Sequence, residues 1–155
     1  MNSKLINFLT ELEKRVRFVY LDSGGAPTIG IGHLLTKDER KSGKIVCGSE
    51  CVKYKNGITA DQCNNLLMRD LDKLIKKLDS IILASLSEFQ RIALISFAFN
   101  IGITAFEEST LLRKLNDLQF DEIPDQLRRW KYDNGKIVNG LIKRREKEVE
   151  MWMGR

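Results

Sequence analysis

The stretch "YLDSGGAPTIGIGH", residues 20–33, decides how the first third of the chain folds. A turn signal, Asp-Ser-Gly-Gly, separates "VRFVYL" from "TIGIGHLL", which are both rich in β-branched and aromatic residues. This pattern predicts a β-hairpin that carries one acid, Asp22, a threonine, Thr28, and the one histidine of the chain, His33. Glycines continue to interrupt the sequence after the hairpin, so residues 15–58 are expected to form a small β-lobe.

Helical signals flank this β segment on both sides. Residues 3–14 carry an apolar stripe at spacings of three and four. The capping box "TADQ" opens a helix over about 59–80, and "SEFQ", at Ser87, opens a helix that is apolar on nearly every face. The pattern predicts an α+β fold in one domain, with a small β-lobe and a larger helical lobe joined by a long helix. We expect residues 81–155 and the N-terminal helix to make the helical lobe, with a cleft between the lobes.

The composition is that of an ordinary soluble globular protein, with 155 residues, 43% hydrophobic and 30% charged. No apolar run reaches the roughly 20 residues that span a bilayer, and the N-terminus does not resemble a secretory signal. The chain is therefore expected to be made and kept in a cytoplasm. Its net charge of +5 favours an anionic partner, such as a nucleic acid, a membrane surface or an acidic polymer. The alternative is that the surface is basic without any such partner.

The cysteines do not indicate a framework of disulfides or a metal site. There are three of them, Cys47, Cys51 and Cys63, and an odd, low number argues against a disulfide scaffold. Together with His33 they make four possible zinc ligands, but their spacing departs from that of zinc ribbons. We therefore expect no metal, and the sequence leaves the redox state of the cysteines open.

Two carboxylates are candidates for chemistry. Glu13 lies near the end of the predicted N-terminal helix, and Asp22 begins the turn of the hairpin. Taken singly, Glu13 is typical of a solvated helix surface, and Asp22 of a turn residue that binds its own amides. Together they make a pair of the kind that glycoside hydrolysis requires, in which one group protonates the leaving oxygen and the other activates water or attacks. Other pairings are possible among the 21 acids of the chain. Thr28 supplies a hydroxyl that can help to hold the water.

His33 is interpreted as a structural residue. We expect it to pair with a carboxylate on the long helix, with Asp70 as the first choice and Asp72 as the second. Other catalytic motifs are absent from the sequence: "GIG" lacks the third glycine of a dinucleotide site, and there is no Walker loop or nucleophile elbow.

Three motifs, near the start, middle and end of the chain, carry a family resemblance. The segments are Glu13, Tyr20-Leu21-Asp22, Gly24-Gly25 and "TIGIGH" (28–33), then "FNIGITAFEESTLLRKLN" (99–116), then "GLIKRREKEVEMW" (140–152). Taken in this order, they resemble the phage lysozyme (endolysin) family, glycoside hydrolase family 24. Lys14 stands where members of that family usually have glycine.

The resemblance implies a lysozyme-like fold and a muramidase. Such an enzyme hydrolyses the β-1,4 bond between N-acetylmuramic acid and N-acetylglucosamine, with inversion and without a cofactor. It makes Glu13 the general acid and Asp22 the carboxylate that stabilises the oxocarbenium-like state and helps to place water, which Thr28 holds. Two carboxyls in an inverting enzyme lie ~6.5–9.5 Å apart. Asn100 is expected to bind substrate.

The resemblance also implies partners and a location. Peptidoglycan is the expected partner, with no nucleic acid, and the chain is expected to be a monomer. Host-cell lysis by a protein that accumulates in the host cytoplasm implies a separate, holin-like pore. Arg144 and Arg145 are expected to be structural, with Glu148 as their ion-pair partner. The alternative function is non-enzymatic binding to the cell wall or membrane through the basic C-terminal helix.

Overall fold

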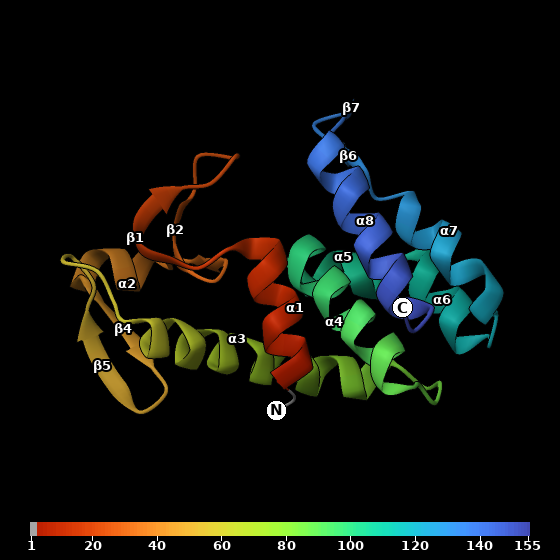
Figure 1. Cartoon of the computed structure of the whole chain (residues 1–155), viewed down its shortest axis with the longest axis horizontal. Helices are drawn as coiled ribbons and strands as arrows, with labels where there is room; N and C mark the ends of the chain where they lie inside the picture. The colour runs from red at the N-terminus through yellow and green to blue at the C-terminus, as the bar shows by residue number, and fades with distance from the viewer. Residues whose placement is uncertain (1–2) are drawn as a thin grey trace. The chain divides into compact units, whose positions relative to one another are not determined.

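A computed structural model describes residues 3–155 of the chain. Its internal contacts divide it into two compact units, Met1–Lys73 and Leu74–Arg155. The boundary lies within the long helix α3 (Ala60–Ile81), drawn in yellow to green in Figure 1. This helix matches the predicted range of about 59–80, and it begins at the predicted capping box: the Thr59 and Gln62 side chains each accept a hydrogen bond from the other's backbone N–H.

The first unit contains the predicted hairpin. Strands β1 and β2 pair antiparallel, with Tyr20 opposite Thr28, and β3 pairs with the other edge of β2. The turn closes where the Asp22 N–H donates to the Ala26 carbonyl at 3.0 Å. A second hairpin, β4–β5, follows. The elements of this unit before α3 are α1 (Ser3–Glu13), β1 (Val16–Leu21), β2 (Pro27–Gly30), β3 (His33–Leu34), α2 (Lys37–Ser42), β4 (Lys44–Cys47) and β5 (Glu50–Lys53).

Helix α2 was not predicted, because the glycine-rich segment around it was interpreted as β structure throughout. Its sequence nevertheless holds a complete capping box. The Thr36 hydroxyl accepts from the Glu39 N–H at 3.2 Å, and the Glu39 carboxylate accepts from the Thr36 N–H at 2.9 Å. Gly43 then ends the helix in a left-handed conformation, with φ of 68°.

Strand β2 approaches α3 closely at one glycine. Gly30 has a positive φ of 72°, and a Cβ at this position would lie 3.4 Å from Leu66 Cδ2. Ile29 and Ile31, on either side, are almost completely buried, as are Cys63 and Leu66 on α3. This contact between β2 and α3 is therefore part of the core of the first unit.

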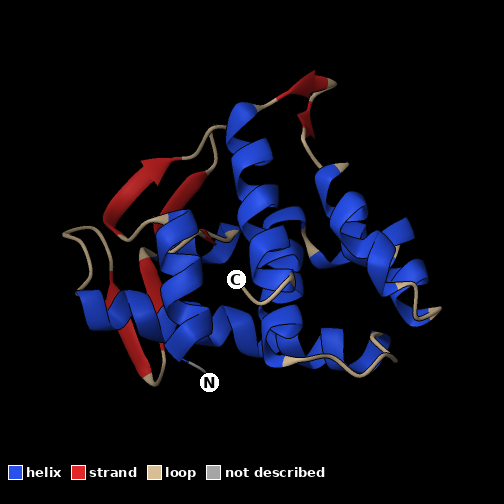
Figure 2. Cartoon of the chain, turned by 45° about the vertical axis from the view of Figure 1, so that its right-hand side comes forward, coloured by secondary structure: helices blue, strands red, loops and turns tan. Residues whose placement is uncertain are grey.

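The second unit is mostly helical, as Figure 2 shows. Its central helix, α4, is buried continuously from Ile92 to Ala98, which confirms the prediction of a helix apolar on nearly every face. Helix α8 packs against α4, and α7 packs against α8. Besides α4 (Glu88–Ile101), the elements are α5 (Ile103–Glu107), α6 (Thr110–Asn116), the 3-10 turn η1 (Phe120–Glu122), α7 (Ile123–Arg128), β6 (Tyr132–Asp133), β7 (Lys136–Ile137) and α8 (Asn139–Trp152).

A buried ionic cluster joins α8 to α4. The Glu148 carboxylate is wholly buried, with Arg145 Nε 2.8 Å and Arg144 Nε 3.2 Å from its oxygens. The Ser96 hydroxyl on α4 donates to the same carboxylate at 2.7 Å. The Arg145 guanidinium also lies over the ring of Phe97, 4.9 Å from its centroid. The expected ion pairing of both arginines with Glu148 is confirmed.

All three cysteines are free thiols in the structure, with Cys47 and Cys63 buried and Cys51 exposed on β5. Burial raises the pKa of the Cys47 thiol to about 11, so this group is protonated at neutral pH. Residues 3–155 hold no group of three or more histidine, cysteine or acidic side chains arranged to bind a metal. Within the same described range, no helix combines the length and apolar character needed to span a membrane.

Candidate active site

Glu13 is the last residue of α1, and its side chain is half-buried. The helix ends because Lys14 turns into the left-handed region, with φ of 59°, while its N–H still donates to the Thr10 carbonyl at 3.0 Å. Glycine adopts this conformation most readily, which gives a physical reason for the glycine that the family usually has here. Lys14 ends the helix in this conformation at some cost in backbone strain.

Asp22 is held in one orientation by its own turn. Its Oδ1 atom accepts hydrogen bonds from the backbone N–H of Gly24 at 2.9 Å and of Ala26 at 2.8 Å. This is the ordinary behaviour of a turn aspartate. Both bonds fall on the same oxygen, so the Oδ2 atom keeps its lone pairs for another donor.

Thr28, on β2, is 2% exposed. Its hydroxyl donates to the Ala26 carbonyl at 2.9 Å, so the hydroxyl oxygen is left as an acceptor. The peptide groups of Ala26 thus orient both side chains, because the Ala26 N–H fixes the Asp22 carboxylate and the Ala26 carbonyl fixes the Thr28 hydroxyl. The turn therefore presents two acceptors, one from each residue.

Tyr20, on β1, is influenced by both candidate carboxylates. Burial raises the pKa of its phenol, and the nearby negative charges of Glu13 and Asp22 raise it further. Both carboxylates therefore lie within electrostatic reach of the same hydroxyl. Tyr20 is also directly opposite Thr28 across β1 and β2. In Figure 1 the chain leaves the end of α1 and runs through a short loop into β1, the first strand of the hairpin.

Asn100 belongs to the second unit, near the end of α4. Its side-chain oxygen accepts a hydrogen bond of 2.7 Å from Nη2 of Arg145, one of the residues in the buried ionic cluster. The bond fixes the amide plane and leaves the amide nitrogen to donate elsewhere.

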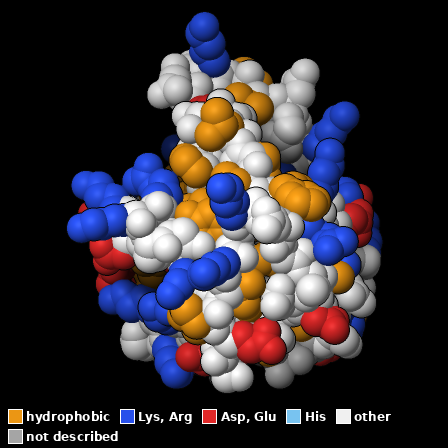
Figure 3. Space-filling view, turned by 90° about the vertical axis from the view of Figure 1, so that its left-hand side faces the viewer, with side chains coloured by type: hydrophobic (Ala, Val, Ile, Leu, Met, Phe, Trp, Pro, Cys, Tyr) orange, Lys and Arg blue, Asp and Glu red, His pale blue; other side chains and the backbone are white. Residues whose placement is uncertain are grey.

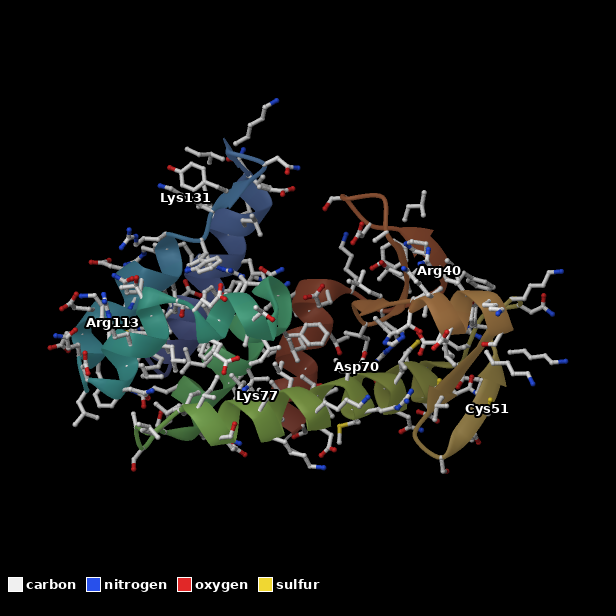
Figure 4. The ribbon with its side chains drawn as sticks, turned by 180° about the vertical axis from the view of Figure 1, so that it is seen from behind. Arg40, Cys51, Asp70, Lys77, Arg113 and Lys131 are labelled. Atoms are coloured by element: carbon white, nitrogen blue, oxygen red, sulfur yellow. The ribbon has the colours of Figure 1, made fainter. Side chains whose placement is uncertain are left out.

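His33 bridges two carboxylates. Its Nδ1 atom lies 2.7 Å from Oδ2 of Asp70 on α3, labelled in Figure 4, and its Nε2 atom lies 3.0 Å from Oε2 of Glu39 on α2. Asp70 was the first choice from the sequence, while the second choice, Asp72, makes neither of these contacts. Glu39 was missed, although its place in the capping box of α2 is the signal that would have positioned it. Burial alone lowers the pKa of His33, but the hydrogen bonds and charges of Asp70 and Glu39 outweigh burial and raise it.

This cluster predicts a pH-dependent contribution to stability. Because the pKa of His33 is raised in the folded state, its stabilisation is complete below the ordinary histidine pKa of ~6.5 and is lost as pH rises through the folded-state pKa. We expect His33→Gln to lower the free energy of unfolding by about 1–3 kcal/mol at about pH 6, and by less at about pH 9. Urea unfolding of both proteins across this range measures the difference. Two parallel stability curves would contradict the prediction.

Basic side chains gather on the segment that contains the hairpins. Residues 14–57 hold nine lysines and arginines against four acidic residues, a local excess equal to the net charge of the whole chain. Figure 3 shows the face of the molecule at this end, where lysine and arginine side chains stand around smaller hydrophobic areas. Such a surface attracts anionic polymers.

Comparison with known proteins identifies the fold and family. The family described as phage lysozyme matches residues 10–148. The chain belongs to the phage lysozyme family. It is 33% identical to the SAR-endolysin of Escherichia phage Mu over 93% of this chain and 75% of the relative. It superposes on a variant of P22 lysozyme with a TM-score of 0.77 and 30% identity, covering 99% of this chain and 97% of the other.

Some relatives are matched over only part of their length. The SAR-endolysin of Bacteriophage PS34 is 41% identical over 61% of this chain, but the match covers 58% of that protein. Membership of the family makes the chain a glycoside hydrolase, a muramidase of the kind that phages use in host-cell lysis. The lysozyme-like α+β fold predicted from the sequence is confirmed.

Proposed function

We propose that this muramidase cleaves the β-1,4 bond between N-acetylmuramic acid and N-acetylglucosamine in peptidoglycan, with Glu13 as general acid and Asp22 as the carboxylate that places water. The observation that supports the proposal is the geometry of the hairpin turn, where the Gly24 and Ala26 amides fix the Asp22 carboxylate and the Ala26 carbonyl fixes the Thr28 hydroxyl. The two acids differ in their surroundings. One ends a helix, and the other is bound by turn amides, as the division of roles between acid and base requires.

The proposed reaction assigns each proton a place. Glu13 gives its proton to the glycosidic oxygen as the bond from that oxygen to the anomeric carbon breaks. Water attacks the anomeric carbon from the opposite face and passes a proton to Asp22. The Oδ2 atom of Asp22 and the Thr28 oxygen are the two acceptors that orient this water. The product then has the inverted configuration, and the two carboxyls are expected ~6.5–9.5 Å apart.

The remaining assignments are also proposals. Asn100 binds substrate through its amide nitrogen, since Arg145 already occupies its oxygen. The basic side chains of residues 14–57 support binding to the anionic cell envelope. Membership of the lysozyme family favours this partner over a nucleic acid. We further propose that residues 1–155 form a single domain, that the protein is a monomer and that it needs no cofactor. It would leave the host cytoplasm through a pore formed by a separate, holin-like protein.

Asp22→Asn tests the proposed mechanism. Asparagine keeps a side-chain oxygen for the Gly24 and Ala26 amides but has no negative charge, so the turn should persist while hydrolysis falls about 100- to 10,000-fold. The measurement is the release of new reducing ends from purified peptidoglycan, with identification of the sugar that carries them. The matched control is Asp38→Asn, an exposed acid in the first turn of α2, which should leave the rate unchanged.

Two results would contradict this proposal. One is an Asp22→Asn enzyme that keeps more than about a tenth of the wild-type rate, a loss too small for a charge that places the attacking water. The other is a wild-type product whose new reducing end is N-acetylglucosamine, because that product comes from the other glycosidic bond of the polymer.

A further inference from the structure

Tyr20 has a hydroxyl group that the protein itself does not use. Within residues 3–155 this hydroxyl makes no hydrogen bond, although the side chain is half-buried and both Glu13 and Asp22 lie within electrostatic reach. The hydroxyl is accessible to solvent, and so also to a ligand. A solvent-accessible donor within electrostatic reach of both proposed catalytic carboxylates can meet a bound substrate.

The register of the hairpin shows where this hydroxyl reaches. Tyr20 and Thr28 are opposite each other on β1 and β2, so their side chains project from the same face of the sheet. The hydroxyl of threonine is attached directly to its Cβ, whereas the tyrosine hydroxyl stands a ring's length farther out. Thr28 can therefore hold water close to the sheet, while Tyr20 extends past that water toward the sugar.

We propose that Tyr20 is a further catalytic residue, whose hydroxyl donates a hydrogen bond to an oxygen of the sugar at the bond being cleaved. This inference rests on the proposed function. The group is suited to the task because a neutral phenol donates a hydrogen bond without adding a charge beside the positive sugar. The negative charges of Glu13, at the end of α1, and Asp22, at the turn, both raise the pKa of this phenol and so favour its protonated form. The bond strengthens as the leaving oxygen gains electron density while its bond to the anomeric carbon breaks, so it acts mainly on the transition state.

The test compares Tyr20→Phe, which removes only the hydroxyl, with wild type on purified peptidoglycan. We expect kcat to fall about 10- to 100-fold with KM within about twofold, since an interaction made chiefly in the transition state affects kcat. The matched control is Tyr54→Phe. The Tyr54 hydroxyl donates to the Glu39 carbonyl at 3.0 Å, so the control removes a structural hydrogen bond and should leave kcat unchanged. Equal kcat for Tyr20→Phe and wild type overturns the inference, and so does a rise in KM at constant kcat.

A second variant keeps the inference testable if phenylalanine disturbs the fold. A ring-fluorinated tyrosine at position 20 keeps the shape and the donor but makes the phenol more acidic. We expect near-normal kcat at acidic to neutral pH and a new loss of activity as pH rises, because an ionised phenol cannot donate. An unchanged pH profile overturns the inference. Wild-type hydrolysis and its loss in Asp22→Asn test the proposed function separately, so Tyr20 can fail as a catalytic residue while that function stands.

Discussion

Replacing Glu13 with glutamine is expected to lower kcat on purified peptidoglycan about 1,000-fold while leaving the protein folded. Glutamine has nearly the shape of glutamate but cannot donate an acidic proton to the leaving oxygen. The side chain is half-buried at the end of α1, and the change removes one negative charge next to Lys14. The helix end should persist, because it is formed by the backbone of Lys14 and because glutamine has nearly the shape of glutamate. Turnover from reducing-end release, together with circular dichroism, measures both parts of the expectation.

A neighbouring acid on the same helix provides the control. Glu11→Gln also removes one carboxylate from the last turns of α1, but its side chain is exposed. We expect this variant to keep kcat within about twofold of wild type, because surface substitutions away from the reacting groups have small effects. Equal losses in Glu11→Gln and Glu13→Gln would show that charge on the helix, and not proton donation by Glu13, determines the rate.

The largest effect on stability is expected at the buried ionic cluster. Glu148→Gln should lower the free energy of unfolding by about 3–5 kcal/mol, because two buried guanidinium groups lose the carboxylate between them. Burial acts to raise the pKa of Glu148, and the charges of Arg145 and Arg144 act to lower it. A neutral glutamine replaces the anion with a weaker hydrogen-bond acceptor. The loss arises because the buried guanidinium charges lose the carboxylate that they share, not because the intact cluster has a large net stability.

Urea unfolding of Glu148→Gln and of Glu150→Gln measures this effect. Glu150 lies on the same helix, α8, but is exposed, so its substitution should change the free energy of unfolding by less than about 0.5 kcal/mol. A loss of under about 1 kcal/mol in Glu148→Gln would mean that solvent or a shift of α8 compensates the arginines. That result would contradict the description of the Glu148 carboxylate as wholly buried.

Much of the fold could be predicted because the strongest signals are local. The capping boxes at Thr59 and Ser87 fix two helix starts, and the apolar run in α4 identifies the centre of the second unit. The short elements were missed where two local signals compete. Helix α2 begins with a capping box but lies among glycines, and the β6–β7 hairpin turns at Asn134-Gly135 with strands of only two residues each.

The candidate site was predicted only in part, because its contacts depend on register and on distant segments. Turn chemistry and the family resemblance indicated Asp22. Neither signal predicts that Tyr20 lies opposite Thr28, because that pairing depends on the register of β1 and β2. The register shifts between Val16 and Tyr20, so it could not be counted from the turn. The second carboxylate on His33 was missed for a related reason: Glu39 reaches the imidazole only because α2 forms.

The most direct measurement for the central claim is the clearing of Gram-negative cells stripped of their outer membrane, by equal amounts of folded wild type and Glu13→Gln. If hydrolysis by Glu13 causes lysis, wild type clears the suspension and the variant clears it about 1,000-fold more slowly. Equal clearing by both proteins would contradict the claim. In that case lysis would come from non-enzymatic binding of the protein to the wall or membrane, and the carboxylate at the end of α1 would have no part in it.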